Sequence, residues 1–256
     1  MIHETAIVSE KADISEGVSI GPYSIIGPDV SIGSDTIIKS HVVITGRTKI
    51  GKQNHFYPFS TIGESPQDMK YKGEDTELEI GDRNTIRESC TINKGTAQDT
   101  GVTRLGDDNW IMAYVHIAHD CQIGNNTVFA NNTTLGGHVE VGDYAIFGGF
   151  SGAHQFCKIG SHSFLAIYSG VAKDLPPYVM VTGQPAVPRG INIEGLKRRD
   201  FSSEQIRNIK NAYKLLYTSD LRLEEAVEKI SGLDEVSNEI QVMLDFLHVS
   251  TRGIIR

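Results

Sequence analysis

The sequence is poor in cysteine and has no long apolar run. Its 256 residues include three cysteines, which have neither the even count of a disulfide framework nor the paired spacing of a zinc site. No stretch reaches the roughly 18 consecutive apolar residues that a membrane-spanning helix needs, and the N-terminal segment lacks the apolar core of a signal peptide. We therefore expect a cytoplasmic protein in a reducing compartment, with no membrane span.

Basic residues are outnumbered as well. The chain has 24 Lys and Arg against 32 Asp and Glu, which gives a formal net charge of -8. A general binder of nucleic acid needs a net basic surface, so we expect no nucleic-acid partner. Hydrophobic residues make up 39% of the chain, which at this length suffices for a sizeable core and excludes global disorder.

An apolar residue recurs every six residues over most of the chain. The series runs from Val8 to Ile62, resumes from Ile80 to Ile92, and continues after a one-residue shift from Leu105 to Val171. Of its 25 positions, 21 are Ile, Leu or Val, and glycine directly follows the apolar residue at twelve of them. We number the apolar residue position one of each hexad; position five is then small or medium-sized.

A period of six fits neither an α-helix nor a plain alternating strand, but it fits a short strand and a turn in every hexad. Positions one and five then face inward together, and glycine or asparagine suits the turns. One hexad cannot bury its apolar residue alone, so coils must stack, with neighbouring strands about 4.8 Å apart. We predict a mainly β fold, a parallel β-helix of hexapeptide repeats, over residues 1–189.

The hexads are interrupted twice and then end. We expect projecting loops at residues 65–79 and 98–104, where the apolar period fails. Beyond residue 190 the spacing becomes helical: Ser202 and Gln205 form a capping box ahead of IRNIKNAYKLLY, and LEEAVEKI and NEIQVMLDFL follow with apolar residues three and four apart. We predict a C-terminal α-helical domain over residues 190–256.

The repeat assigns a position to every cysteine and histidine. Cys90, Cys121 and Cys157 all occupy position five, which predicts buried fillers rather than reactive thiols. No histidine of the hexads occupies position one or five, so these rings are expected to face outward or to lie at turns.

One column of outward residues has the groups that acyl transfer needs. His119, Gly137 and Gln155 are 18 residues apart, which puts them one above the other in successive coils. They would supply a general base, a backbone N–H without side-chain hindrance and an amide, and Asp120 could orient the base. Further histidines lie beside the column: His116, His138 and His154. From spacing alone, a catalytic strip and a solvated histidine cluster remain equally good interpretations.

The hexads resemble those of the left-handed β-helix family of acyl- and acetyltransferases. The resemblance implies three hexads in each triangular coil and a left-handed winding, against the usual right-handed crossover. It also implies a homotrimer with active sites in the clefts between subunits.

Five further motifs resemble a narrower family, the UDP-N-acetylglucosamine acyltransferases. They are QDMKYKGE (67–74), HIAHDC (116–121), GGH (136–138), HQFC (154–157) and NIEGLKRR (192–199). The resemblance implies transfer of an (R)-3-hydroxyacyl group from acyl carrier protein to the 3-hydroxyl of UDP-N-acetylglucosamine, the first step of lipid A biosynthesis. No cofactor and no metal are implied, because the thioester of the donor is already activated.

The same resemblance assigns roles to residues of this chain. His119 is implied as the general base, Asp120 as its orienting partner and the Gly137 N–H as the oxyanion donor. The other residues are implied as substrate contacts: Gln67, Asp68 and Lys70 on the first loop, His116, His138 and Gln155 on the strip, and Asn192, Glu194, Arg198 and Arg199 in the last motif. Guanidinium groups pair bidentately with phosphate, which suits the two arginines to the pyrophosphate, although a solvated helix start is the alternative for them.

Two positions depart from the family pattern. Asn93 stands in TINKGT where relatives often have histidine, which puts a nucleotide contact from that position in doubt. Ile167 stands where family members set the length of the acyl chain, and a bulky residue there implies a shorter chain than glycine would.

Three other readings are open. The first is an N-acyltransferase of the same pathway or a sugar acetyltransferase, although the N-terminal uridine-binding domain usual in the N-acyltransferase is missing. The second is a metal-dependent carbonic anhydrase, which needs three neutral histidines converging on Zn²⁺. The third is a structural β-helix without catalysis, which leaves the histidine strip and the first loop unexplained.

Overall fold

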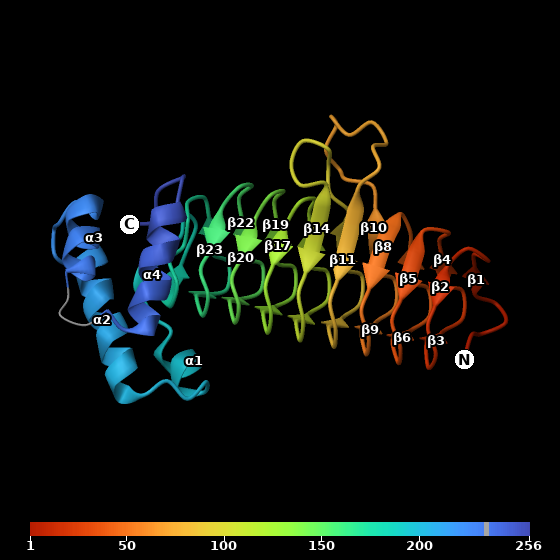
Figure 1. Cartoon of the computed structure of the whole chain (residues 1–256), viewed down its shortest axis with the longest axis horizontal. Coiled ribbons are helices and arrows are strands. Elements are labelled where there is room, and N and C mark those ends of the chain that lie inside the picture. The colour runs from red at the N-terminus through yellow and green to blue at the C-terminus, as the bar shows by residue number, and fades with distance from the viewer. Residues whose placement is uncertain (233–235) are drawn as a thin grey trace.

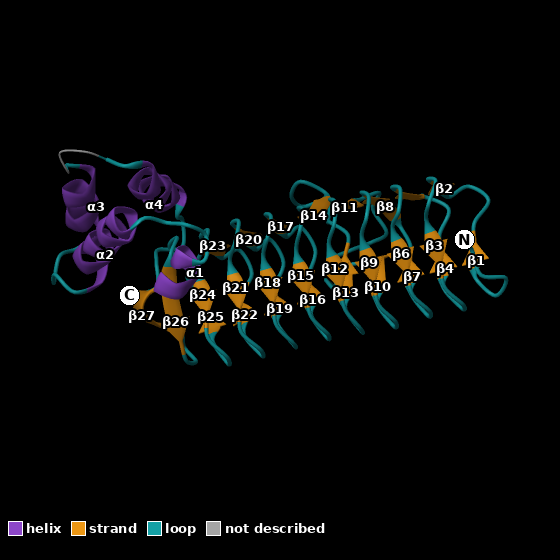
Figure 2. Ribbon diagram, turned by 90° about the horizontal axis from the view of Figure 1, so that it is seen from below, coloured by secondary structure: helices purple, strands orange, loops and turns teal. Residues whose placement is uncertain are grey.

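The computed structural model describes residues 1–232 and 236–256 of the chain. Short strands wind into a three-sided prism that extends from the N-terminus along the long axis, and helices gather at the far end (Figure 1). Strands of one side lie next to one another along this axis, as the row of orange arrows in Figure 2 shows. We call the three sides faces I, II and III, in the order in which the chain visits them.

Faces I and II are parallel sheets. Face I contains β1 (Ile7–Val8), β4 (Ile25–Ile26), β7 (Val43–Ile44), β10 (Thr61–Glu64), β13 (Thr91–Asn93), β16 (His116–Ile117), β19 (Thr134–Leu135), β22 (Gly152–Ala153) and β25 (Gly170–Val171). Face II contains β2 (Asp13–Ile14), β5 (Val30–Ile32), β8 (Arg47–Ile50), β11 (Glu77–Ile80), β14 (Val102–Leu105), β17 (Gln122–Ile123), β20 (Glu140–Val141) and β23 (Lys158–Ile159).

Face III is parallel except for its last two strands, which pair antiparallel. It contains β3 (Ser19–Ile20), β6 (Ile37–Ile38), β9 (His55–Phe56), β12 (Thr85–Ile86), β15 (Trp110–Ile111), β18 (Val128–Phe129), β21 (Ile146–Phe147), β24 (Phe164–Leu165), β26 (Val179–Thr182) and β27 (Val187–Ile191).

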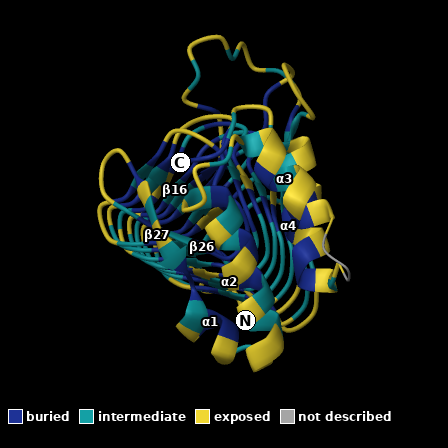
Figure 3. Cartoon of the chain, turned by 90° about the vertical axis from the view of Figure 1, so that its left-hand side faces the viewer, coloured by how far each residue is buried: buried dark blue, intermediate teal, exposed yellow. Residues whose placement is uncertain are grey.

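The interior follows the hexapeptide pattern. Residues 18 apart pair in register, as His116 does with Thr134, so each coil takes three hexads. Position-one side chains such as Phe56 and Leu135 are fully buried. At position five, Ser24 is buried and its hydroxyl donates to the Lys39 carbonyl at 2.8 Å, so this polar group is satisfied inside the coil. Figure 3 shows the buried residues lining the inside of the coils. The predicted inward facing of positions one and five is confirmed.

The three cysteines lie in this interior, as predicted. Cys90, Cys121 and Cys157 are all buried and free. Burial raises the pKa of their thiols to about 11, 12 and 11 respectively. The thiols are therefore protonated and poor nucleophiles at neutral pH.

Most turns between faces carry a residue with positive φ at position four. We name the corners after the faces that they join. Corner I–II carries Asp120, His138 and Phe156, corner II–III carries Tyr144, His162 and Tyr178, and corner III–I carries Tyr114, Phe150 and Tyr168. Because the backbone repeats, the corners differ mainly in these side chains.

The two interruptions are placed differently from our expectation. The first spans residues 65–76 and the second 94–101, because β11 already begins at Glu77 and β14 at Val102. Glu77 pairs with Arg47 on one side and with Val102 on the other, so the strand ladder extends beyond the apolar positions that define the period. For this reason the expected ends of the bounds 65–79 and 98–104 were wrong, and the expected start at 98 was wrong because β13 already ends at Asn93.

Helices follow the last strand, which runs to Ile191 and so passes the boundary expected at residue 189. They are α1 (Ile193–Lys197), α2 (Ser203–Tyr217), α3 (Leu223–Ser231) and α4 (Asn238–Val249). The capping box of Ser202 and Gln205 is present at the start of α2, as predicted. In the described ranges, no helix has both the length and the apolar character to cross a membrane.

Candidate active site

A polar pocket of about 380 Å³ lies at corner I–II, under the two loops that project from the coils. Its lining brings together residues from the first loop, the second loop and successive coils. They are Gln67, Asp68, Lys70, Asn93, Gln98, Ala118, His119, His138, Gln155 and Phe156. Seven of the positions singled out in the sequence thus meet in one place: Gln67, Asp68, Lys70, Asn93, His119, His138 and Gln155.

The centre of this pocket is a histidine–carboxylate pair. Nδ1 of His119 lies 2.8 Å from Oδ2 of Asp120, and the Asp120 side chain is fully buried. Thr96 donates its backbone N–H to both carboxylate oxygens at 3.0 Å and its hydroxyl to Oδ2 at 2.7 Å. Burial raises the pKa of Asp120, but the hydrogen bonds from His119 and Thr96 outweigh burial and hold this pKa below its ordinary value. Asp120 is therefore an anion that fixes the His119 ring with Nε2 free.

Gly137 lies directly against the His119 ring. A Cβ added at Gly137 would stand 2.5 Å from Cε1 and 2.7 Å from Nε2 of His119, so only glycine leaves the ring in place. The backbone N–H of Gly137 donates no hydrogen bond to any residue in the described part of the chain. A free N–H beside a possible base is the arrangement that stabilises a developing oxyanion.

His138 and His116 lie near this pair in different settings. The His138 ring stands edge-on to that of His119, with centroids 5.0 Å apart, and it lines the pocket. His116 does not line the pocket; its Nδ1 lies 2.7 Å from Oγ1 of Thr91. Burial, and then the neighbouring His119, lower the pKa of His116, which favours its neutral form.

Asn93 joins the base of the first loop to the coil. Its Nδ2 donates to the backbone carbonyls of Glu64 and Ser65 at 3.4 and 3.2 Å. Its Oδ1 is buried and finds no hydrogen-bond partner among the described residues. This buried oxygen, an unused acceptor next to the pocket, is available to a donor group of a ligand.

The last motif lies elsewhere in the chain. Asn192 donates from Nδ2 to the His162 carbonyl at 3.0 Å and caps α1 by accepting from the Gly195 N–H. The Arg199 guanidinium lies 4.8 Å from the centre of the Tyr144 ring. These contacts place the segment from Asn192 to Arg199, with Glu194 and Arg198, at corner II–III. Within one chain it is not part of the pocket around His119.

Ile167 is also apart from this pocket. It lies beside Tyr168 at corner III–I and is 60% exposed. A groove of about 570 Å³ runs along face I towards the same corner; Gly152 and Gly170 line it, and the Gln184 side chain lies over Gly170. His154 lines this groove rather than the histidine pocket.

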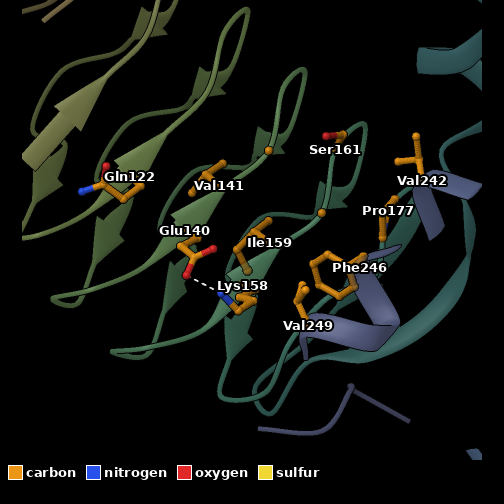
Figure 4. Close-up of a pocket in the computed structure, with 12 residues that line it drawn as sticks. Gln122, Glu140, Val141, Lys158, Ile159, Ser161, Pro177, Val242, Phe246 and Val249 are labelled. Carbon is orange, nitrogen blue, oxygen red and sulfur yellow. Dashed lines mark hydrogen bonds and ion pairs between the residues drawn. The ribbon is translucent and has the colours of Figure 1, made fainter. Parts of the chain in front are cut away.

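Another hollow, of about 280 Å³, lies between face II and α4 (Figure 4). The ion pair of Glu140 and Lys158 borders it on one side, and Val242, Phe246 and Val249 approach from the helix. It contains no histidine or nucleophilic thiol.

Sequence reasoning missed the residues that the second loop supplies. Thr96 holds Asp120, and Asp99 lies 2.7 Å from Nδ1 of His138 through its Oδ2. Gln98 of the same loop and Phe156 of corner I–II complete the lining. The failure of the period near residue 98 was the available signal, because a loop that leaves a β-helix close to a histidine column can cover it.

His119, Asp120 and His138 offer donor atoms within 4.8 Å of one another, a spacing that a metal ion could bridge. The set contains two histidines and a carboxylate, not the three histidines of the carbonic anhydrase reading. The Asp120 oxygens are engaged by Thr96 and His119, so a metal would have to displace those hydrogen bonds.

Comparison with known proteins identifies relatives over most of the chain. A family model described as Udp N-acetylglucosamine O-acyltransferase, domain 2, matches residues 174–255, and one for bacterial transferase hexapeptide repeats matches 11–46 and 103–137. The acyl-[acyl-carrier-protein]--UDP-N-acetylglucosamine O-acyltransferase of Thiobacillus denitrificans is 58% identical over 204 residues, 80% of this chain and 79% of the relative. That of Verminephrobacter eiseniae is 52% identical over 217 residues, 83% of each chain.

Solved structures extend the likeness to the whole length. LpxA from Acinetobacter baumannii has a TM-score of 0.97 at 47% identity and covers 100% of this chain and 99% of its own. The UDP-N-acetylglucosamine acyltransferase of Francisella novicida has a TM-score of 0.98 at 45% identity, with 100% and 94% covered. The predicted left-handed β-helix with C-terminal helices is confirmed. By identity, coverage and fold, the chain belongs to the UDP-N-acetylglucosamine O-acyltransferase family.

Proposed function

We propose that this protein transfers an (R)-3-hydroxyacyl group from acyl carrier protein to the 3-hydroxyl of UDP-N-acetylglucosamine, as the first step of lipid A biosynthesis. The supporting observation is the buried Asp120 that holds His119 next to the unused N–H of Gly137. Loop residues Asp68 and Lys70 face the same pocket. The location that we propose is the cytoplasm.

The reaction needs a base, an oxyanion donor and alignment. Asp120 accepts a hydrogen bond from the Nδ1–H of His119, so Nε2 can take the proton of the acceptor hydroxyl. The freed oxygen attacks the thioester carbonyl and forms a C–O bond, while the Gly137 N–H stabilises the negative charge on the carbonyl oxygen. The C–S bond then breaks, and His119 returns its proton to the departing sulfur. In this proposal the chain uses no metal or cofactor.

The faces of the prism support assembly into a ring. Outward side chains of face III are largely apolar, among them Trp110, Val128 and Phe164, whereas those of face II are charged, among them Lys49 and Glu79. Aromatic residues of corner III–I are exposed by 54 to 63%: Tyr23, Phe59, Tyr114, Phe150 and Tyr168. Such an exposed apolar edge between faces I and III is typical of a subunit interface.

We propose a homotrimer in which corner III–I lies near the axis and face I of each subunit packs against face III of the next. The outer edge of face I is corner I–II, and the outer edge of face III is corner II–III. In such a ring, His119 of one subunit approaches Arg199 of its neighbour. Asn192, Glu194, Arg198 and Arg199 would then contact the nucleotide, with the arginines at the pyrophosphate. The face I groove, and Ile167, would contact the acyl chain.

The function is tested by assaying the purified protein with UDP-N-acetylglucosamine and a series of acyl carrier protein thioesters. We expect O-acylation that needs both substrates. His119→Ala should retain the fold and assembly but lose turnover by about 10² to 10⁴, as expected for a missing general base. Turnover by this variant close to that of the native protein would refute the mechanism, and absence of O-acylation by the native protein would refute the function.

A further inference from the structure

A second histidine–carboxylate pair lies in the same pocket as the first. Oδ2 of Asp99, on the loop of residues 94–101, lies 2.7 Å from Nδ1 of His138. The two residues are 39 apart in the chain, so the contact joins the second loop to the coil. The Asp99 side chain is 45% exposed, whereas that of His138 is only 12% exposed.

The plane of the His138 ring is fixed by its neighbours. It stacks on Phe156 with centroids 4.4 Å apart and an interplanar angle of 10°, and it stands at 88° to the His119 ring. The stacking holds the plane of the ring, and a flip that exchanges the positions of its two nitrogens would break the contact with Asp99. Asp99 therefore decides which nitrogen faces the loop and which faces the pocket.

The other ring nitrogen has no partner within the described residues. Nε2 of His138 lies 3.9 Å from Oδ2 of Asp120, which is too far for a hydrogen bond. The charged or titratable groups around the ring are Asp99, Asp120 and His119, with Asp68 and Lys70 across the pocket. Nε2 is thus the atom through which His138 can meet a ligand.

The hydrogen bond to Asp99 determines which ring nitrogen of His138 carries the hydrogen. An ionised carboxylate only accepts, so Nδ1 must carry a hydrogen while Asp99 is bound. In the neutral ring Nε2 then has a lone pair and acts as an acceptor. Without Asp99, a neutral imidazole can carry its hydrogen on either nitrogen, and a part of the population loses the acceptor at Nε2.

We propose that Asp99 is a positioning residue that holds His138 in the Nδ1–H tautomer, so that Nε2 accepts a hydrogen bond from a donor group of the acceptor sugar. The proposal rests on the proposed function for the identity of that sugar. The donor group is a hydroxyl or the acetamido N–H other than the reacting hydroxyl, which His119 serves. The pocket then has two imidazoles, each oriented by a carboxylate: His119 acts in the chemistry, and His138 binds the acceptor.

The test compares Asp99→Ala with Asp99→Asn and with Thr100→Ala as a control on the same loop. In the described part of the chain, the Thr100 hydroxyl bonds only to the backbone of Val102 at the start of β14, so its loss perturbs the loop without touching His138. The amide oxygen of the asparagine can still accept from Nδ1, so this variant should preserve the tautomer. ¹⁵N NMR of histidine-labelled protein reports the tautomer directly, with the His138 signals assigned through His138→Gln.

We expect the native protein, Asp99→Asn and Thr100→Ala to show His138 with its hydrogen on Nδ1, and Asp99→Ala to show a mixture. The KM for UDP-N-acetylglucosamine should rise about 5- to 20-fold in Asp99→Ala, with kcat changing by less than about 3-fold, since one partly exposed hydrogen bond to a charged group is lost. Asp99→Asn should stay within about 3-fold of the native KM.

An unchanged tautomer in Asp99→Ala would overturn the proposal, as would an equal rise of KM in Thr100→Ala. The tautomer measurement needs no turnover. Failure of the native protein to acylate UDP-N-acetylglucosamine would therefore refute the proposed function without touching the role of Asp99, and the two failures are distinguishable.

Discussion

Corners I–II and III–I have the same backbone and opposite surroundings. Both carry positive φ at position four, for example 61° at His138 and 55° at Phe150. At corner I–II the side chains contact one another and two loops around a polar pocket. At corner III–I, Phe150 and Tyr168 stack on each other and are more than half exposed. The repeat therefore supplies matching turns at these two corners, and under the proposed function the side chains at each turn determine whether it serves chemistry or assembly.

The largest effect should come from one methyl group at the first corner. Gly137→Ala places its Cβ 2.5 Å from Cε1 of His119, so the ring must move. We expect kcat to fall by about 10²-fold or more, because a displacement of about 1 Å at a reacting group has that cost. Steady-state kinetics and a melting curve separate this loss from unfolding.

Gly149→Ala is the matched control at corner III–I. Gly149 occupies the same repeat position, but an added Cβ there approaches only the Asn131 carbonyl, at 3.4 Å. Its kcat should stay within about 3-fold of the native value. Equal losses in the two variants would mean that the corners are not functionally different.

Ile167 tests whether corner III–I also borders the acyl chain. A branched side chain there fills space that glycine would leave open, and overpacking by a few methylenes costs about 1 to 3 kcal/mol, or roughly 5- to 150-fold in relative kcat/KM. The native enzyme should prefer decanoyl-class over tetradecanoyl-class donors. Ile167→Gly should shift this preference towards longer chains at an unchanged KM for UDP-N-acetylglucosamine. An unaltered chain-length profile would exclude Ile167 from the acyl pocket.

The arginines extend the comparison to corner II–III. If Arg198 and Arg199 hold the pyrophosphate, alanine at either position should raise the KM for UDP-N-acetylglucosamine about 10-fold, more than that for the acyl donor. Added salt should reduce the difference in this KM between the variant and the native protein. Effects restricted to the KM for acyl carrier protein would instead place the two arginines in its docking surface.

The smallest effect is expected from a substitution inside the coil, away from the corners. Cys121 is buried and its thiol donates to the Gly136 carbonyl at 3.2 Å. Cys121→Ala should keep most of the activity and lower the free energy of unfolding by about 1 kcal/mol through lost packing, measured by urea titration. Stoichiometric labelling of a native thiol that abolishes activity without unfolding would contradict this account.

The interior and the first histidine–carboxylate pair could be predicted because both depend on local sequence. Every position-one residue fills the same interior, so the period of six fixes coil, register and the burial of Cys121. His119 and Asp120 are adjacent, and Gly137 follows 18 residues later, so the repeat alone brings them together. The distances among these three groups then follow from the coil geometry.

The loops and the distant corner could not be predicted in this way. Where Glu77 and Val102 join the ladder depends on their strand partners, not on the apolar period. Thr96 and Asp99 reach the pocket through backbone that follows no repeat. Arg199 lies at another corner of the chain, against Tyr144, and the part that we propose for it in the site depends on the proposed packing of subunits.

The central claim, that one subunit supplies His119 and its neighbour supplies Arg199, is tested most directly by mixing two variants. His119→Ala and Arg199→Ala proteins are assayed separately and after dissociation and random reassembly together, at UDP-N-acetylglucosamine well below the native KM. A site between subunits predicts that each mixed trimer contains one native site, so activity should recover to about one quarter of the native value. Activity of the mixture no higher than the mean of the two separate variants would show that both residues act within one subunit and would contradict the account.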